Sequence, residues 1–531
     1  MSAADTPVPS TSPVKAGVGR SAFLVAAGIF LTRISGLVRD RIFSHYFGLS
    51  YAADAFRSAL RIPNFLQNLF GEGVLSASFI PVYAKLLAEE KQEEAGRVAG
   101  AVFSLLALVS SVLVLAGVVA TPFLIDAIAP GFKGETRRLA IQLVRIFFPS
   151  AGVLVLSAWC LGILNSHRKF FLSYISPVMM NLAIIVALIW FGRSDLPRLA
   201  VYAAWASVPG SALQFLVQLP VVLRLATAIR LGFRSANENV RTVIKNFLPV
   251  FVARGVTQLS AYVDNLLASF LPTGAVAALS NAQTLYLLPI SLFGMSVSAA
   301  ELPAMSSTLG NEEQVAAVLR GRISSSTRRI AFFVVPSAIA FLALGDVVAA
   351  AIYQTGQFTR SDSVYVWIIL AGSAVGLVAA TVGRLYSSAY YALRDTRTPL
   401  RYAILRVLLT SGLGYLCALA LPKVLGFDPK WGVAGLTASA GFAAWVEFLL
   451  LRRGMRRRIG PIELHAVYFA KLWLSAVIAA AVGWGLELAL HPRDPRIAGA
   501  VILIPYGLAY LGMTAVLGID QTAALVKRLR R

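Results

Sequence analysis

Ionisable residues interrupt an otherwise apolar stretch near the start of the chain, from Phe30 to Pro81. Arg39 and Asp40 lie six and seven residues after Arg33, so the three residues fall within a broad common face of one helix. Such a face predicts a receptor for phosphate or carboxylate groups, because the fixed fork of arginine donors matches their oxygens. The ionisable residues of the stretch that bear on this prediction are Arg33, Arg39, Asp40, Asp54, Arg57, Arg61 and Glu72.

Simpler roles compete for some of these side chains. Arg39, Asp40 and Arg41 could form an ion-paired helix end at the membrane interface, and Arg57 could extend to the surface from the outer end of the second segment. A structural role is expected for Arg41 and Arg57. Asp54 precedes the second apolar segment, so capping that helix is as good an explanation as facing a ligand. Arg33 has apolar neighbours on both sides and is the residue least easily explained by structure alone.

The composition indicates that membrane-spanning helices carry these residues. Of the 531 residues, 57% are hydrophobic and 14% are charged, which is too little polar surface for a soluble globule of this length. The net charge of +23 would fit nucleic-acid binding, but the Lys and Arg residues lie in short clusters between apolar runs of about 20 residues, the length that spans a bilayer. We therefore predict an all-α polytopic membrane protein.

About fourteen apolar segments are long enough to span. Prolines inside several of them, such as Pro63, Pro177 and Pro289, predict kinks as well as ends. Residues 1–19 are rich in Pro, Ser and Thr, which predicts a disordered tail, and they lack the features of a signal peptide. The expected segments are about 20–46, 56–88, 97–129, 137–165, 170–192, 197–226, 241–271, 275–308, 325–354, 362–393, 398–421, 432–453, 465–489 and 496–518.

The basic clusters between segments predict the orientation. With the N-terminus inside, most loop Lys and Arg residues fall on one side, which the positive-inside rule makes cytoplasmic. Both termini are then expected in the cytoplasm. The cluster at 452–458 fits a topology anchor and a site for anionic lipid headgroups equally well.

Two ordered pairs of motifs suggest an internal repeat. GVLSASFIP at 73–81 resembles GMSVSAAELP at 294–303, and IAPGF at 128–132 resembles YQTGQF at 353–358. An even number of helices per copy predicts two lobes related by a pseudo-twofold axis along the membrane normal, with substrate between them near mid-membrane. The predicted divisions are 1–19 (tail), 20–228 (N-lobe), 229–455 (C-lobe) and 456–531 (two further helices and a basic tail).

The sequence predicts no enzymatic site. The four histidines are scattered without metal-ligand spacing, and no GxxxxGK[ST] nucleotide motif is present. Cys160 and Cys417 lie in apolar runs and are expected to be small core residues. Asp264 and Arg254, in the seventh segment, form either an ion site or an internal pair.

Several motifs closely resemble those of the MurJ/MviN lipid II flippases, a family of the multidrug/oligosaccharidyl-lipid/polysaccharide exporter superfamily. The resemblance covers nearly the whole chain. It is carried by TRISGLVRD (32–40), ADAF (53–56), IPNFLQNLFGEGVLSASFIP (62–81), APGF (129–132), QTGQFT (354–359) and DTRTP (395–399).

This resemblance implies a fourteen-helix transporter with two six-helix lobes and two C-terminal helices that form a groove for a polyprenyl tail. Its implied cargo is lipid II, the polyprenyl-pyrophosphate-linked peptidoglycan precursor, moved from the cytoplasmic to the outer leaflet of the bacterial plasma (inner) membrane by alternating access. A monomer is expected, with cell-wall synthesis proteins as further partners. The implied substrate-binding residues are Arg33, Arg39, Asp40, Asp54, Arg61, Asn64, Gln67, Glu72 and Thr284.

Two departures from the family pattern concern this site. Family members commonly have arginine where this chain has Gln67, three residues after Asn64, and Thr284, five residues before Pro289. Arg61 is expected to compensate in part. Where family members bind sodium, Asp264 matches a carboxylate, but Thr410 and Gly414 replace the expected polar partners, so a monovalent cation is left open.

Other functions remain open at this stage. A flippase for another polyprenyl-linked glycan fits the residues almost as well, because of Gln67 and Thr284. A multidrug exporter would favour acidic groups for cationic drugs, which the arginines of the first helix oppose. A membrane scaffold or a lipid-processing enzyme is the alternative outside transport.

Overall fold

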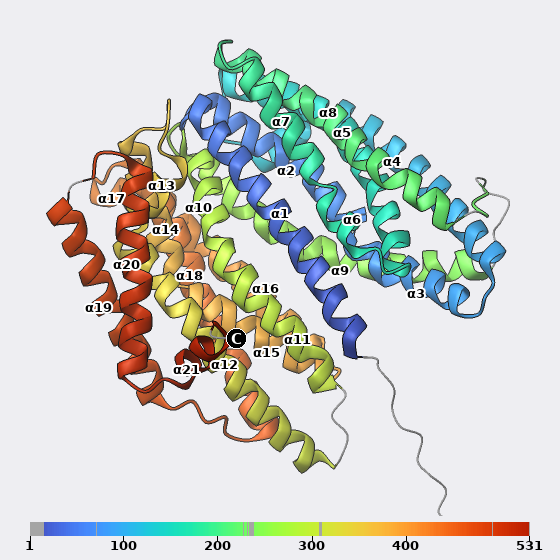
Figure 1. The fold of residues 1–531 in the computed structure, drawn as a ribbon. Coiled ribbons are helices and arrows are strands. Elements are labelled where there is room, and N and C mark those ends of the chain that lie inside the picture. Colours follow the sequence, from blue (N-terminus) through green and yellow to red (C-terminus); the bar gives the residue numbers. More distant parts are fainter. Residues whose placement is uncertain are drawn as a thin grey trace, which may run out of the picture. The chain divides into compact units, whose positions relative to one another are not determined.

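The computed structural model describes residues 15–529 except 71, 227, 231, 233–237, 307–310 and 491. The described residues form helices joined by short loops, with one isolated antiparallel bridge between Thr355 and Phe358 (Figure 1). Among them, 10 helices are long and apolar enough to cross a membrane, or up to 11 when the bent pair at 360–392 counts as one span. The chain is thus an all-helical, multi-pass membrane protein, as predicted.

The first half of the chain contains nine helices within the described residues. They are α1 (Lys15–Phe47), α2 (Tyr51–Phe70), α3 (Glu72–Ala88), α4 (Gln92–Ile128), α5 (Gly134–Ser166), α6 (Phe170–Ile175), α7 (Val178–Trp190), α8 (Leu196–Leu225) and α9 (Glu238–Ser269).

The second half continues this pattern with shorter, more often broken helices. They are α10 (Ala275–Pro289), the π-helix η1 (Ile290–Met295), α11 (Ser296–Ser306), α12 (Glu312–Ala343), α13 (Gly345–Tyr353), α14 (Arg360–Ala374), α15 (Leu377–Ala392), α16 (Arg397–Tyr415), the π-helix η2 (Leu416–Ala420), α17 (Leu421–Leu425), the 3-10 helix η3 (Pro429–Trp431), α18 (Gly432–Ile459), α19 (Ala466–Leu490), α20 (Pro495–Val516) and α21 (Asp520–Leu529).

Within the described residues, each of the fourteen expected apolar segments coincides with one helix or with two or three consecutive helices. Proline effects differ by position: Pro177 separates α6 from α7, Pro289 precedes the π-helical turn η1, and Pro149 and Pro209 lie inside continuous helices. Proline removes one backbone donor, and neighbouring groups decide whether the helix breaks.

The chain ends differ from the sequence expectation. Helix α1 begins at Lys15, five residues before the expected start, and the predicted disordered tail otherwise lies outside the described residues. Near the C-terminus, where a basic tail was expected, Asp520–Leu529 form helix α21.

The chain divides into two compact units. Unit 1 comprises Met1–Arg39, Leu60–Thr121 and Gln142–Thr257, and unit 2 comprises Asp40–Ala59, Pro122–Ile141 and Gln258–Arg531. Unit 2 therefore combines the predicted C-lobe from Gln258 onward and the C-terminal helices with two short segments of the predicted N-lobe, whereas residues 229–257 of the predicted C-lobe belong to unit 1. The lobe limits at 228/229 and 455/456 remain predictions.

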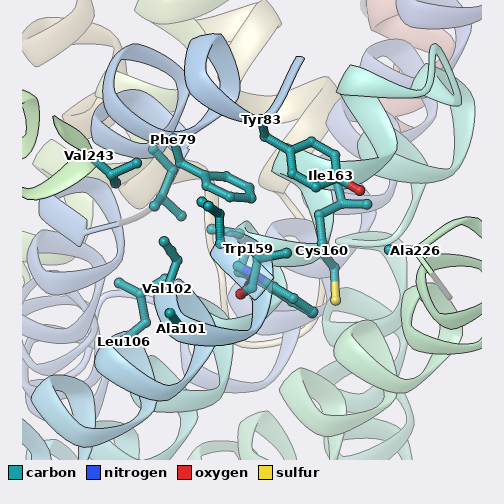
Figure 2. Close-up of a cluster of buried hydrophobic side chains, with 14 of the residues drawn as sticks. Phe79, Tyr83, Ala101, Val102, Leu106, Trp159, Cys160, Ile163, Ala226 and Val243 are labelled. Atoms are coloured by element: carbon teal, nitrogen blue, oxygen red, sulfur yellow. Dashed lines mark hydrogen bonds between the residues drawn. The ribbon is translucent and has the colours of Figure 1, made fainter. Parts of the chain in front are cut away.

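The core of unit 1 packs around Trp159 on α5 (Figure 2). The indole of Trp159 donates a hydrogen bond of 3.0 Å to the carbonyl oxygen of Ala99 and contacts the ring of Phe103. Cys160, the next residue, is fully buried in the same cluster. Its expected role as a small core residue is confirmed.

In unit 2 the C-terminal helices pack against α12. The hydroxyl of Tyr510 on α20 donates a hydrogen bond of 2.6 Å to the carbonyl oxygen of Phe332. That carbonyl lies four residues before Pro336, which has no N–H to donate to it. A side chain of α20 therefore satisfies the acceptor that a proline leaves open in α12.

Candidate functional site

Helix α1 carries the two candidate arginines of unit 1. Arg33 is exposed and Arg39 is half-buried. The Nη1 of Arg39 donates a hydrogen bond of 2.9 Å to Oδ1 of Asn181 on α7, and Nδ2 of Asn181 donates one of 2.8 Å to Oγ of Ser35. This network fixes the guanidinium of Arg39 relative to α1 and α7, which preorganises it for an anion.

Asp40, the next residue, belongs to a buried ion pair in unit 2. Its carboxylate lies 3.0 Å from Nη1 of Arg57 on α2, and the two side chains are 6% and 7% exposed. Arg57 also donates a hydrogen bond of 3.1 Å to Oδ1 of Asn281 on α10, and its guanidinium lies 4.6 Å from the ring centre of Phe43. One arginine therefore joins α1, α2 and α10.

The expected structural role of Arg57 agrees with this geometry. Asp40 was expected among the substrate-binding residues, and here its carboxylate accepts from a buried guanidinium. Binding by Asp40 thus stays a prediction that would require the ion pair to separate.

Asp54 caps a different helix from the one that the sequence suggested. It lies inside α2, three residues after the helix begins at Tyr51. Its two carboxylate oxygens accept hydrogen bonds of 2.6 Å from the backbone N–H of Gly274 and 2.8 Å from that of Ala277, at the start of α10. The alternative that Asp54 caps the second helix is wrong, because the orphan donors that it satisfies belong to α10.

The end of α1 is held to the loop that contains the QTGQFT motif. His45 accepts a hydrogen bond of 2.8 Å from the N–H of Gln357 through its carbonyl oxygen, and its Nδ1 lies 2.9 Å from Oγ1 of Thr355. Between these residues Gly356 has a φ of +56°, and a Cβ there would lie 2.4 Å from that same carbonyl oxygen. Only glycine fits this close approach.

Arg41 has the structural role that was expected for it. Its Nη1 donates hydrogen bonds of 2.7 Å to the carbonyl oxygens of both Ala351 and Ile352, near the end of α13. Terminal carbonyls of a helix have no partner within the helix, and a cation satisfies them well.

The remaining candidates are less constrained by the described contacts. Arg61, Asn64 and Gln67 are half-buried on α2, and α3 begins at Glu72, whose side chain lies outside the described part. Thr284 is half-buried on α10 and donates a hydrogen bond of 3.0 Å to the carbonyl oxygen of Ser280. Their predicted contact with substrate stays a prediction.

A monovalent-cation site at Asp264 stays a prediction. Asp264 is half-buried on α9, in unit 2. Gly414 offers no side-chain donor, and a Cβ at that position would lie 2.8 Å from a methyl group of Leu436 and 3.1 Å from one of Leu267. Within the described residues no group of three or more His, Cys, Asp or Glu side chains could hold a metal ion.

Asp395, in the DTRTP motif, shapes the start of α16. Its Oδ1 accepts hydrogen bonds of 3.0 Å from the N–H groups of both Arg397 and Thr398, and its Oδ2 accepts one of 2.6 Å from the Thr398 hydroxyl. These bonds, with Arg458 at 2.5 Å, lower the pKa of Asp395 to about 2 despite partial desolvation. The motif therefore forms a charged start of α16.

Sequence reasoning missed the two asparagines of these networks. Asn181 and Asn281 are buried, and each accepts from one of the arginines. For Asn181 a lone amide inside the apolar helix α7 was the available signal, because a buried amide needs a partner. Asn281 has other polar residues beside it on α10, so its sequence carries no such signal.

Comparisons with known proteins agree on one family. The sequence model of the family described as "Lipid II flippase MurJ" matches residues 43–493. The lipid II flippase MurJ of Burkholderia cenocepacia is 29% identical, with 94% of this chain and 97% of that protein covered. The probable lipid II flippase MurJ of Rickettsia prowazekii is 27% identical, with 96% and 97% covered.

Solved structures show the same relationship. A structure of "Lipid II flippase MurJ, inward closed conformation" superposes with a TM-score of 0.77 at 25% identity, covering 94% of this chain and 99% of that one. An inward-facing multidrug transporter of the MATE family superposes with a TM-score of 0.63 at 18% identity, covering 82% and 98%. The second likeness shows a shared fold only.

Proposed function

The chain belongs to the lipid II flippase MurJ family, and from that premise we propose that it moves lipid II from the cytoplasmic to the outer leaflet of the bacterial plasma membrane. The observation that carries the proposal is the match of 94% of the chain to a solved lipid II flippase, at a TM-score of 0.77. We infer a transporter without enzymatic activity, acting as a monomer with both termini in the cytoplasm.

Arg33 and Arg39 would take the place of water around the pyrophosphate. A bare phosphate cannot enter hydrocarbon at tolerable cost, and guanidinium groups on a membrane helix offset that cost. The bond from Arg39 to Asn181 supports this role, because it holds the guanidinium in place while Arg33 stays exposed. Arg61, Asn64, Gln67, Glu72 and Thr284 would complete the contacts to the headgroup.

The contacts of unit 2 support alternating access. In the predicted topology the end of α1 and the starts of α2 and α10 lie on the outer side of the membrane. There Arg57 joins Asp40 to Asn281, and Asp54 accepts from Gly274. These bonds join the predicted N-lobe to the predicted C-lobe, so we propose that they hold the outer side closed and separate when cargo leaves.

Energy coupling is a separate question. A cation site at Asp264 stays a prediction, and no step of this mechanism passes through sodium. Membrane potential, another ion gradient or consumption of the product by cell-wall synthesis proteins would supply the direction.

Complementation tests the proposed cargo. Cells depleted of their own lipid II flippase would express this chain at a verified membrane level, and we expect growth and cell shape to be restored. A well-folded protein that fails to restore growth would contradict the proposal.

A flippase for another polyprenyl-linked glycan is the second candidate, favoured by Gln67 and Thr284 at positions where the family commonly has arginine. The double variant Gln67→Arg/Thr284→Arg separates the two. Rescue by that variant alone would show that the natural chain is adapted to a different cargo.

A further inference from the structure

Four arginines at the end of α18 line a surface hollow that the transport mechanism does not use. The hollow has a volume of about 660 Å³. Arg452 and Arg456 are four residues apart, as are Arg453 and Arg457, so the four form two adjacent rows on one broad face of the helix. The lining residues are Leu449, Arg452, Arg453, Arg456, Arg457 and Pro461.

The positive charge of this hollow is not balanced by the described residues. The next arginine, Arg458, pairs with Asp395 at 2.5 Å, but no described carboxylate lies within 4.0 Å of the four that line the hollow. The Nε of Arg452 is buried, and no described group accepts its hydrogen. A buried donor without an acceptor costs free energy, so an anionic ligand would be stabilised here.

A neighbouring hollow provides a contrast. It shares Pro461 with the first hollow, has a volume of about 720 Å³, and is lined by Arg320, Arg328 and Arg329 together with Glu463 and Asp520. Carboxylates there offset much of the positive charge. The hollow at the end of α18 lacks such carboxylates and is the stronger anion site.

The lining also has an apolar side. Leu449 is 52% exposed and lies about one turn before Arg452, toward the middle of the spanning helix. A soluble anion would use only the arginines, whereas a lipid would also cover this leucine. Basic hollows beside spanning helices at the cytoplasmic surface suit anionic lipid headgroups.

We propose that this hollow binds an anionic membrane phospholipid, with its phosphodiester at Arg452 and Arg456 and an acyl chain along Leu449. The end of α18 beside the hollow is held in place, because Arg320 donates a hydrogen bond to the carbonyl oxygen of Ile459 and Arg458 is paired with Asp395. Bound lipid would hold the end of α18 at the membrane surface. This inference does not depend on the identity of the transported cargo.

Lipid binding by the purified full-length protein tests the proposal. After delipidation in detergent, the protein is titrated with fluorescent phosphatidylglycerol, and with phosphatidylcholine carrying the same label. We expect saturable binding of phosphatidylglycerol that is about thirtyfold weaker in Arg452→Gln/Arg456→Gln, from the usual contribution of two surface arginines. Arg452→Lys/Arg456→Lys keeps the charge and should keep most of the affinity.

A matched control removes two exposed arginines elsewhere, Arg224→Gln/Arg241→Gln, and should bind as the wild type does. Thermal unfolding of every variant guards against misfolding. Equal binding of phosphatidylcholine, an equal loss of affinity in the control, or unchanged binding in Arg452→Gln/Arg456→Gln would each overturn the proposal. So would displacement of the labelled lipid by millimolar inorganic phosphate, because that result would show a site for the free anion.

Discussion

The carboxylate of Asp40 lies 3.0 Å from the guanidinium of Arg57, although the two residues belong to different helices. Both side chains are almost fully buried, and Arg57 also contacts Asn281 on α10. A buried ion pair contributes little more stability than an apolar pair would, but it can specify which helices meet. That property suits a contact that closes one side of a transporter.

Removing one partner of this pair should be strongly destabilising. Arg57→Ala leaves Asp40 buried without its cation, which typically costs about 3 to 5 kcal/mol. Thermal unfolding of the purified protein measures the effect. The matched control is Arg137→Ala, which removes an exposed partner of Asp126 and should cost about 1 kcal/mol or less. Equal losses in the two variants would contradict the burial of Asp40.

The cap that Asp54 provides for α10 predicts a second effect. Asp54→Ala leaves the N–H groups of Gly274 and Ala277 without their acceptor, and loss of a cap costs about 1 to 2 kcal/mol. Because these bonds join the proposed outer ends of the lobes, transport should fall as well. Asp494→Ala, which removes an exposed cap of α20, should lower stability slightly and leave transport unchanged. Normal transport by Asp54→Ala would count against the closure role.

The bond between Tyr510 and Phe332 predicts how firmly the C-terminal helices are attached. Tyr510→Phe removes the donor for the carbonyl oxygen that Pro336 leaves open, at a cost of about 1 to 3 kcal/mol. Tyr415→Phe, at a 57% exposed position, is the control and should have almost no effect. Thermal unfolding that does not distinguish the two variants would refute the assignment.

Features that depend on neighbouring residues could be predicted from the sequence, whereas contacts between residues far apart in the chain could not. The apolar runs are local features of the sequence, and the described residues of all fourteen expected segments are mainly helical. The roles of Arg57 and Asp54 could not be predicted from the sequence, because their partners Asn281 and Gly274 are more than 200 residues away along the chain. Asp54 in particular looked like a cap for its own helix and caps another.

The compact units show the same limit. The predicted lobe limit near residue 228 stays a prediction, and the packing of Asp40–Ala59 and Pro122–Ile141 with the second unit is a feature that the sequence does not indicate. Helix ends follow the partners they meet in the folded state, and hydrophobic periodicity does not encode those partners.

A pH effect is expected where α5 ends. Partial burial lowers the pKa of His167 below its ordinary value of 6.5, and its Nε2 lies 3.2 Å from the hydroxyl of Tyr83. The folded state therefore favours neutral His167. The stability that this preference contributes is present above the pKa of His167 in the unfolded chain and is lost as the pH falls below that pKa. Between about pH 8 and pH 5, wild type should lose more thermal stability than His167→Gln. Equal pH dependence would exclude His167 as the source.

The most direct test of the central claim is lipid II transport in vesicles that contain only the purified protein. We predict that wild type moves labelled lipid II between leaflets, that Arg33→Ala/Arg39→Ala does so at least tenfold more slowly, and that the exposed-surface control Arg138→Ala matches wild type. Wild-type vesicles that show no transport, or a double variant that transports at the wild-type rate, would contradict the account.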